Sequence, residues 1–358
     1  MEIKECMKNI NYTEALIHLV ESPGLEKENP KWGQSLLEKT QEGKYKLEKY
    51  IHRGLEGIIV LARDSQNLRD VIFKFAIPKL DEKTSFFNRF DELPFFRQRK
   101  TSNINETETS KRFIRSCYIQ QQISEIIRIE NLGIYGNVPI FYNMGKEQYL
   151  YAEMEYITGY ELIEWCKKQE KDRAIVELFY KILMLIEKAF HNKGYIHSDL
   201  KPSAIIVRND FPILYDFGLS KNLKTDYQVT RKNQVMGTLP FAPKSQLQDF
   251  ANRDYKVDIF ALGVILYYMF LRKTPESWIK TQHITNFYKI HHIKYIEKTS
   301  IRYVFQRAIR IGFPYFSIAD MRKDFEKRVL KEEKKTVFDV KILEKIVNIW
   351  EETFPERK

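Results

Sequence analysis

The sequence contains little cysteine, and this excludes some classes of protein. Its 358 residues include three cysteines, Cys6, Cys117 and Cys166, and no CxxC pair. An odd number at irregular spacing argues against a disulfide framework and indicates a reducing compartment. We therefore expect a cytoplasmic protein, or one of the host cytosol if its source is a virus or an intracellular bacterium.

Long apolar runs are also absent. The longest, from Ile259 to Phe270, is shorter than the roughly 20 residues that a membrane-spanning helix needs, so we expect a buried helix and no membrane partner. The first residues, MEIKECMKNI, include acidic side chains and no apolar core, which predicts that no signal peptide is present. The chain also has no internal repeat and no low-complexity segment.

Positive charge is what the sequence has in excess. Lys and Arg number 59 against 48 Asp and Glu, a formal charge of +11, while apolar residues make up 43%. This apolar content excludes a disordered or collagen-like chain, and the length fits one large domain or two ordinary ones. The charge favours phosphate-bearing or acidic partners. Because the basic residues alternate with acids, it argues only weakly for nucleic-acid binding.

The first half of the chain alternates between polar and β-rich segments. Residues 1–44 are polar with one short apolar cluster, which predicts a helical extension. Apolar runs within 45–77 predict three antiparallel strands, and two more are expected between 138 and 157. A helix is expected at 109–132. The polar segment 79–108 is too long for an ordinary connection and predicts an insert, whose paired aromatics pack on this part or dock a partner.

After Gly159 the apolar spacing becomes helical for most of the remaining chain. Short strands near Ile205 and Ile213 are the exceptions. The sequence therefore predicts an α+β fold with a small β-rich part over 45–158 and a larger helical part over 159–358.

The segment YIHSDLKPSAIIVRNDFPILYDFGLSK carries the strongest chemical signal. It places Asp199 17 residues before Asp216, with Lys201 just after the first acid. Phosphoryl transfer needs such parts: one acid to accept a proton from a hydroxyl, a second to hold a metal on the phosphates, and a cation to offset charge. Two capped turns would also use aspartates, but they would not require HxDxKP followed by DFG.

These motifs resemble the eukaryotic-type protein kinase family, and DLKP resembles its Ser/Thr branch. The resemblance implies a bilobal fold, with a regulatory helix in the small N-lobe and a larger α-helical C-lobe. It implies ATP and Mg²⁺ as cofactors, with Mn²⁺ as an alternative, and protein substrates. In those roles Asp199 and Lys201 would be catalytic, with Lys201 neutralising the γ-phosphate, and Asp216 would bind the metal.

The resemblance also implies a nucleotide site upstream. IHRGLEGII is similar to the glycine-rich hairpin, VIFK to the strand that carries the phosphate-binding lysine, and MEYI to the connector beside adenine. Glycines in the hairpin would let the backbone approach the phosphates closely. The implied nucleotide-binding residues are Gly54, Gly57, Ile59, Lys74, Met154, Glu155 and Ile157.

The carboxylate that would pair with Lys74 is ambiguous, because the insert shifts the register. The candidates are Glu106, Glu108 and Glu125. We favour Glu125, whose distance from the next strand is similar to that in casein-kinase-like members. Ile129 would then join an apolar column with Phe217 and His197. The alternative is that Glu125 is a solvent-facing helix residue.

Two downstream segments extend the resemblance over about residues 45–272. GTLPFAPK, at 237–244, is similar to the end of the activation loop, and VDIFALG to a buried helix of the C-lobe. A buried Asp258 needs hydrogen-bond donors, and backbone amides of the catalytic loop would supply them.

Four residues depart from the family pattern. Ala204 replaces the metal-binding Asn, which leaves Asp216 as the main protein ligand. Ser198 replaces the arginine beside the catalytic aspartate, so we expect no arginine there to bind an activation-loop phosphate and no need for that phosphate. Lys244 replaces the glutamate of APE, and His52 replaces the first loop glycine.

An active protein Ser/Thr kinase is the interpretation that we favour, because the other motif residues survive together. A pseudokinase scaffold that binds nucleotide weakly or not at all is the first alternative, and Ala204 is the reason for it. A small-molecule phosphotransferase is the second. Those enzymes share a short HxD loop but lack the GTLPFAPK segment, which would build a peptide platform.

Overall fold

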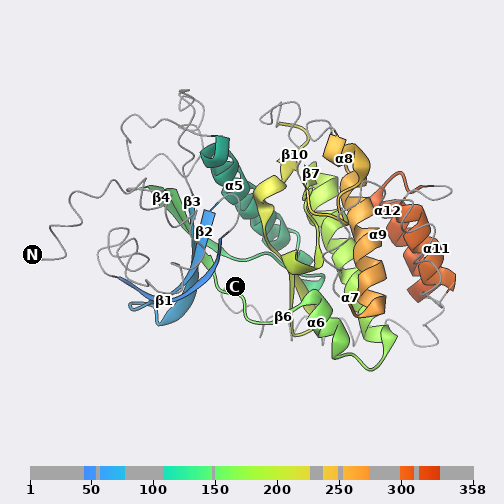
Figure 1. Cartoon of the computed structure of the whole chain (residues 1–358), viewed down its shortest axis with the longest axis horizontal. Helices are drawn as coiled ribbons and strands as arrows, with labels where there is room; N and C mark the ends of the chain where they lie inside the picture. The colour runs from blue at the N-terminus through green and yellow to red at the C-terminus, as the bar shows by residue number, and fades with distance from the viewer. Residues whose placement is uncertain are drawn as a thin grey trace, which may run out of the picture. The chain divides into compact units, whose positions relative to one another are not determined.

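The computed structural model describes part of the chain (Figure 1). The described residues are 44–53, 57–76, 108–146, 150–225, 237–248, 253–273, 299–309 and 314–330. The chain divides into two compact units. The smaller takes in the chain up to Tyr118 together with Ile140–Tyr156, and the larger takes in Ile119–Pro139 and the chain from Ile157 onward.

One antiparallel sheet forms the centre of the smaller unit. Its strands, in spatial order, are β1 (Tyr45–Arg53), β2 (Gly57–Asp64), β3 (Arg69–Ala76), β5 (Leu150–Glu155) and β4 (Phe141–Lys146). Side chains alternate between the two faces of a strand. On β3, Val71 and Phe73 therefore pack in a buried cluster with Tyr45, whereas Lys74 projects from the opposite face. The five predicted strands are confirmed.

Helix α5 (Glu108–Ile129) contributes to the core of both units, and it confirms the helix predicted at 109–132. In the smaller unit Phe113 and Ile114 pack in a cluster with Ala76. Four-residue spacing keeps a second set of its residues on one face of the helix. That set, in the core of the larger unit, is Ile119, Ile123 and Ile127.

The larger unit is mainly helical. Its helices include α6 (Leu162–Lys167), α7 (Asp172–Leu185), α8 (Lys244–Gln248), α9 (Lys256–Leu271), α11 (Thr299–Ala308) and α12 (Ile318–Phe325). Two small sheets accompany them, one of β6 (Tyr160–Glu161), β8 (Ile205–Arg208) and β9 (Phe211–Leu214), the other of β7 (Tyr195–Ile196) and β10 (Lys221–Asn222).

Helix α9 is buried almost along its whole length. It packs against α6, α7 and α11 (Figure 1). Every residue from Val257 to Met269 is buried. A helix that is apolar on all sides is stable in water only when it is enclosed. The buried helix predicted from the longest apolar run is confirmed. Within the described part of the chain, no helix is both long and apolar enough to cross a membrane.

The predicted α+β architecture is confirmed, with a small β-rich unit that contains a helix and a larger helical unit. The predicted extension over 1–44 and the insert over 79–108 lie outside the described residues, apart from Lys44 and Glu108. The domain bounds at 45–158 and 159–358 stay predictions.

Candidate active site

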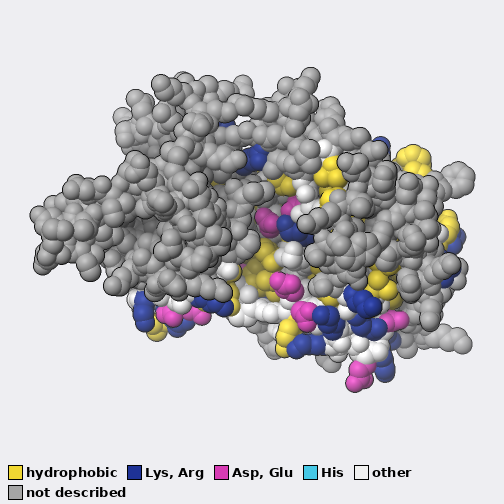
Figure 2. Space-filling model, viewed as in Figure 1, with side chains coloured by type: hydrophobic (Ala, Val, Ile, Leu, Met, Phe, Trp, Pro, Cys, Tyr) yellow, Lys and Arg dark blue, Asp and Glu magenta, His cyan; other side chains and the backbone are white. Residues whose placement is uncertain are grey.

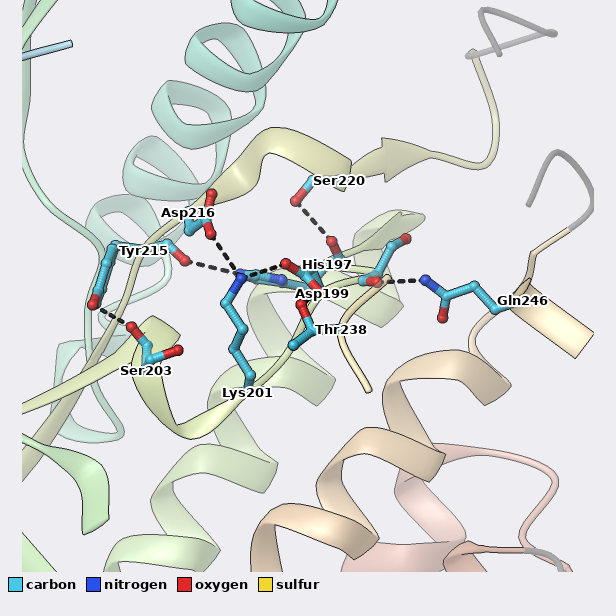
Figure 3. Close-up of polar contacts among 10 residues, drawn as sticks. His197, Asp199, Lys201, Ser203, Tyr215, Asp216, Ser220, Thr238 and Gln246 are labelled. Atoms are coloured by element: carbon cyan, nitrogen blue, oxygen red, sulfur yellow. Dashed lines mark hydrogen bonds and ion pairs between the residues drawn. The ribbon is translucent and has the colours of Figure 1, made fainter. Parts of the chain in front are cut away.

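Two loops of the larger unit bring together the two predicted catalytic residues and the predicted metal-binding residue (Figure 3). Asp199 and Lys201 follow strand β7, and Asp216 follows β9. The short β8–β9 hairpin connects the loops. The Lys201 Nζ donates to Asp199 Oδ2 at 2.5 Å and to Asp216 Oδ2 at 3.1 Å. One ammonium group therefore holds both carboxylates.

The three side chains differ in their access to solvent. Asp199 is 10% exposed and Lys201 18%, whereas Asp216 is 41% exposed. Burial disfavours the charged form of Lys201, but attraction to Asp216 and Asp199 outweighs burial and raises its pKa. Lys201 thus stays cationic at neutral pH. Its charge is available to an anionic group that approaches the two aspartates.

Thr238 holds the other oxygen of the first acid. Its Oγ1 donates to Asp199 Oδ1 at 2.8 Å, while Lys201 binds Oδ2. Both oxygens have a donor, so the plane of the carboxylate is fixed. Thr238 belongs to the GTLPFAPK segment, but its contact with Asp199 was not predicted. The motif's order along the chain gave no indication of this contact.

Asp258 of α9 supports the catalytic loop from beneath. Its carboxylate accepts from the His197 N–H and the Ser198 N–H, each at 2.8 Å, and contacts His191 Nε2 at 3.0 Å. Burial acts to raise the pKa of Asp258, but the hydrogen bonds from His191 and His197 lower it below its usual range. The prediction that Asp258 binds backbone amides of this loop is confirmed. The His191 contact was not foreseen.

An aromatic cluster joins the two loops. The His197 and Phe217 ring centroids lie 5.4 Å apart, and Phe190 stacks on Phe217 at 6.1 Å. The expectation that Ile129 joins this column is wrong, because Ile129 is 64% exposed. Two residues along a helix turn the side chain by about 200°, so the buried Ile127 faces inward and Ile129 faces out.

Glu125 has a different partner from the one predicted. Its carboxylate accepts from Arg128 Nε at 3.2 Å on the exposed surface of α5, and the hydrogen bond from Arg128 lowers its pKa. The Lys74 Nζ instead lies 5.7 Å from the ring centroid of Phe113. Phe113 precedes Glu125 by about 18 Å along a straight helix. The structure therefore supports the alternative, a solvent-facing Glu125.

The other predicted nucleotide-binding residues lie on the sheet of the smaller unit or beside it. Ile59 on β2 is the register partner of Lys74 on β3. Glu155 ends β5, where its N–H donates to Ile140 O and its carboxylate accepts from the Ile140 N–H. Gly57 begins β2, Met154 lies on β5, and Ile157 follows the strand. Gly54 lies outside the described residues, and roles in nucleotide binding stay predictions.

A divalent cation has one suitable ligand among these loops. The exposed Asp216 carboxylate is a hard oxygen donor of the kind that Mg²⁺ prefers. Ala204 is buried and offers only its backbone, whose N–H donates to Lys201 O and whose carbonyl accepts from the Tyr215 N–H. In the described part of the chain, no group of three or more His, Cys, Asp or Glu could enclose a metal. The residues therefore fit one weakly enclosed cation.

An arginine from further along the chain lies beside the catalytic loop, a contact that the sequence did not predict. Arg253, which precedes α9, donates from Nε to Ser198 Oγ at 2.9 Å. Gln246 of α8 donates to Ser198 O at 2.8 Å. Both side chains come from more than forty residues downstream, and neither belongs to a motif that sequence analysis used.

A loop lysine thus lies between two loop aspartates, and a buried aspartate beneath them holds the backbone of the first loop. A family model for the protein kinase domain matches residues 46–339. Since the match covers more than half of the chain, the protein belongs to the protein kinase domain family.

Curated relatives agree with this assignment at low identity. The chain is 26% identical to the mouse dual specificity protein kinase TTK, over 57% of this chain and 22% of that protein. It is 28% identical to a probable serine/threonine-protein kinase of Clostridium acetobutylicum, over 65% of this chain and 30% of that protein. It is 35% identical to the rat interferon-induced, double-stranded RNA-activated protein kinase, over 34% of this chain and 24% of that protein. The matches cover less than a third of each relative's length.

Proposed function

We propose that this kinase domain is catalytically competent and transfers the γ-phosphate of ATP to Ser or Thr hydroxyls of protein substrates. The observation that carries the proposal is the Lys201 ammonium between Asp199 and Asp216, with Thr238 on the remaining Asp199 oxygen. The Lys201 ammonium lies within hydrogen-bond distance of both the proposed proton acceptor, Asp199, and the proposed metal ligand, Asp216. A chain that had lost this chemistry would have no need to keep all three.

In the proposed reaction Asp199 orients the substrate hydroxyl and accepts its proton. The hydroxyl oxygen forms a bond to the γ-phosphorus as the bond from that phosphorus to the ADP oxygen breaks, and the proton passes from Asp199 to solvent. Lys201 offsets negative charge on the transferring group. Thr238 and Lys201 hold the carboxylate in one orientation, so little reorganisation is needed during transfer.

Bound Mg²⁺, or Mn²⁺ in its place, would neutralise charge on the phosphates, and Asp216 is the residue that we propose to hold it. Lys74 and the sheet residues beside it are proposed to bind the nucleotide. Because Ala204 lacks a ligand atom, we expect weaker metal affinity than a site with two protein ligands would have. A pseudokinase is the second candidate, and Ala204 is the observation that favours it.

We further propose that activity does not need phosphorylation of the activation loop. Ser198 offers no cation to a phosphate. The catalytic loop is already held at Ser198 by three buried side chains, Asp258, Gln246 and Arg253. Introducing a phosphate would therefore add no contact that the loop requires.

A protein substrate with an acidic surface is the partner that the charge of +11 favours. Acidic and basic side chains are mixed over the described part of the face in Figure 2, without a broad area of one sign. This mixture does not favour nucleic acid. A reducing compartment also stays a proposal, and the buried thiols of Cys117 and Cys166 are compatible with it.

A transfer assay tests the proposed activity. The full chain is incubated with γ-labelled ATP and casein in Mg²⁺ and in Mn²⁺, and labelled amino acids are identified after hydrolysis. We expect labelled Ser or Thr, and its loss in Asp199→Asn. The matched control is Asp70→Asn, which makes the same change at an exposed ion pair with Arg63 on the smaller unit. No labelling by the wild-type chain in either metal would favour the pseudokinase.

A further inference from the structure

Ser198 is the residue whose conformation aims the catalytic aspartate. It lies between His197 and Asp199 and has a φ of 66°, in the left-handed region that residues other than glycine rarely adopt. Such a conformation persists where surrounding groups hold it in place. Any relaxation of Ser198 would rotate the next residue, Asp199, away from its hydrogen-bond partners.

Each polar group of Ser198 is bound by a side chain from a distant part of the chain. Its N–H donates to Asp258, its carbonyl accepts from Gln246, and its hydroxyl accepts from Arg253 Nε, at 2.8, 2.8 and 2.9 Å. All three side chains are buried, with Arg253 only 5% exposed. Their arrangement around one strained residue suits a positioning role.

Arg253 also reaches the second loop of the site. Its Nη2 donates to Leu219 O at 3.0 Å, and Leu219 lies directly after the Asp216-Phe217-Gly218 motif. A single guanidinium thus connects the loop that carries the proton acceptor with the loop that carries the metal ligand. The planar group has donors in fixed directions, which lets it bind two separate acceptors at once.

We propose that Arg253 is a positioning residue that holds the catalytic loop and the metal-binding loop in their working arrangement. Its buried guanidinium acts on Asp199 through Ser198 and on Asp216 through Leu219. This built-in cation makes an activation-loop phosphate unnecessary for ordering the two loops. The inference rests on the proposed function, and it deepens the account of the same site.

Steady-state kinetics of Arg253→Met test the role. We expect kcat to fall about 10- to 100-fold, since a small displacement of reacting groups has effects of this size. The KM for ATP should change less than about threefold, because Arg253 is not proposed to contact the nucleotide. Arg253→Lys should recover only part of kcat, as an ammonium group cannot reproduce both directed bonds.

Arg272→Met is the matched control for the loss of a guanidinium. Arg272 binds Cys166 O at 3.2 Å and Asp172 at 2.9 Å, elsewhere in the larger unit. We expect this variant to lose thermal stability without a comparable loss of kcat. Equal kcat losses in the two variants would reduce Arg253 to a structural role and overturn the inference.

Ser198→Ala provides a milder variant if Arg253→Met fails to fold. It removes one acceptor and leaves the Leu219 bond of Arg253 in place, so we expect kcat to fall less than in Arg253→Met. Combining the two changes should cost less than the product of the single losses, because both remove the same hydrogen bond. Full multiplicativity would show that the residues act independently and would refute the coupling.

Amide hydrogen exchange separates this inference from the proposed activity. The backbone amides of peptides that span residues 195–204 should exchange faster in Arg253→Met than in either the wild type or Arg272→Met. That result supports the positioning role even if the wild-type chain transfers no phosphate, in which case only the proposed function fails. If the wild type is active and Arg253→Met changes neither the exchange nor kcat, the positioning role is contradicted while the proposed function stands.

Discussion

Replacement of Asp258 by Asn is the perturbation whose effect can best be worked out from the structure. Asp258 is fully buried and accepts hydrogen bonds from two backbone N–H groups and a ring nitrogen of His191. An amide of the same shape keeps one accepting oxygen but turns an NH₂ group toward the second backbone donor. That donor is then buried without an acceptor.

The expected loss follows from the groups left unsatisfied. A buried donor without a partner costs about 1–3 kcal/mol, and bonds to a charged acceptor are stronger than those to a neutral one. We therefore expect Asp258→Asn to lower the free energy of unfolding by about 2–4 kcal/mol, a large part of the roughly 5–15 kcal/mol typical of a domain. With an unfolding entropy of roughly 0.75 kcal/mol/K for 358 residues, the midpoint of thermal unfolding should fall by about 3–5 °C.

The pH dependence supplies a second signature. The pKa of Asp258 is lowered in the folded protein, so the unfolded state takes up its proton first as the pH falls. The stabilisation by Asp258 is fully present above the unfolded pKa, near about 4, and is lost as the pH drops through the lower folded value. The free energy of unfolding of Asp258→Asn should therefore fall less between pH 7 and pH 3 than that of the wild type, because Asn does not titrate.

Thermal unfolding followed by circular dichroism between pH 7 and pH 3 measures both effects. The control is Asp254→Asn. Asp254 is exposed and lies just before the same helix, where its side chain accepts a hydrogen bond from the Lys256 N–H that an Asn oxygen can also accept. It should remain within about 1 kcal/mol of wild type. A midpoint for Asp258→Asn that coincides with the control at pH 7 would refute the claim that buried backbone donors depend on this carboxylate.

Three further predictions concern activity. Ala204→Asn should lower the Mg²⁺ concentration needed for half-maximal transfer and raise turnover, because it adds a ligand oxygen; an unchanged metal titration would contradict the single-ligand site. The triple change Thr225→Ala, Tyr227→Phe and Thr230→Ala should keep the transfer rate within about threefold of wild type, since we propose that a loop phosphate adds no contact that orders the site; a collapse in rate would show that loop phosphorylation is required. Thr238→Val should lower kcat by about tenfold, a loss equivalent to one hydrogen bond to a charged group; unaltered kcat at normal thermal stability would mean that this contact does not orient the catalytic carboxylate.

Some tertiary relations were predictable because short segments enforce them. Asp199 and Asp216 are joined by the β8–β9 hairpin, which leaves little freedom in how the two loops meet, although the bonds from Lys201 to both carboxylates were not predicted. The apolar run of α9 could only be a buried helix. Its single aspartate, Asp258, then needed buried donors close by, and the catalytic loop supplies them.

Other relations depended on rotation and distance that a linear pattern leaves open. A helix with apolar residues every three or four positions can be turned by one residue without losing its pattern, so Glu125 and Ile129 were assigned inward although both face solvent. The polar segment 79–108, which we predict to be an insert, left the spacing between Lys74 and its carboxylate ambiguous, so spacing could not correct this assignment.

By itself, the sequence determined the elements, the fold family and the identity of the acids and the lysine, because these depend on local periodicity and on motifs held within a short stretch of chain. Only the tertiary structure decided that Arg253 and Gln246 close around Ser198. Such contacts join polar side chains far apart along the chain, and no periodicity records them, since their partners are set by how the helices pack rather than by residue spacing.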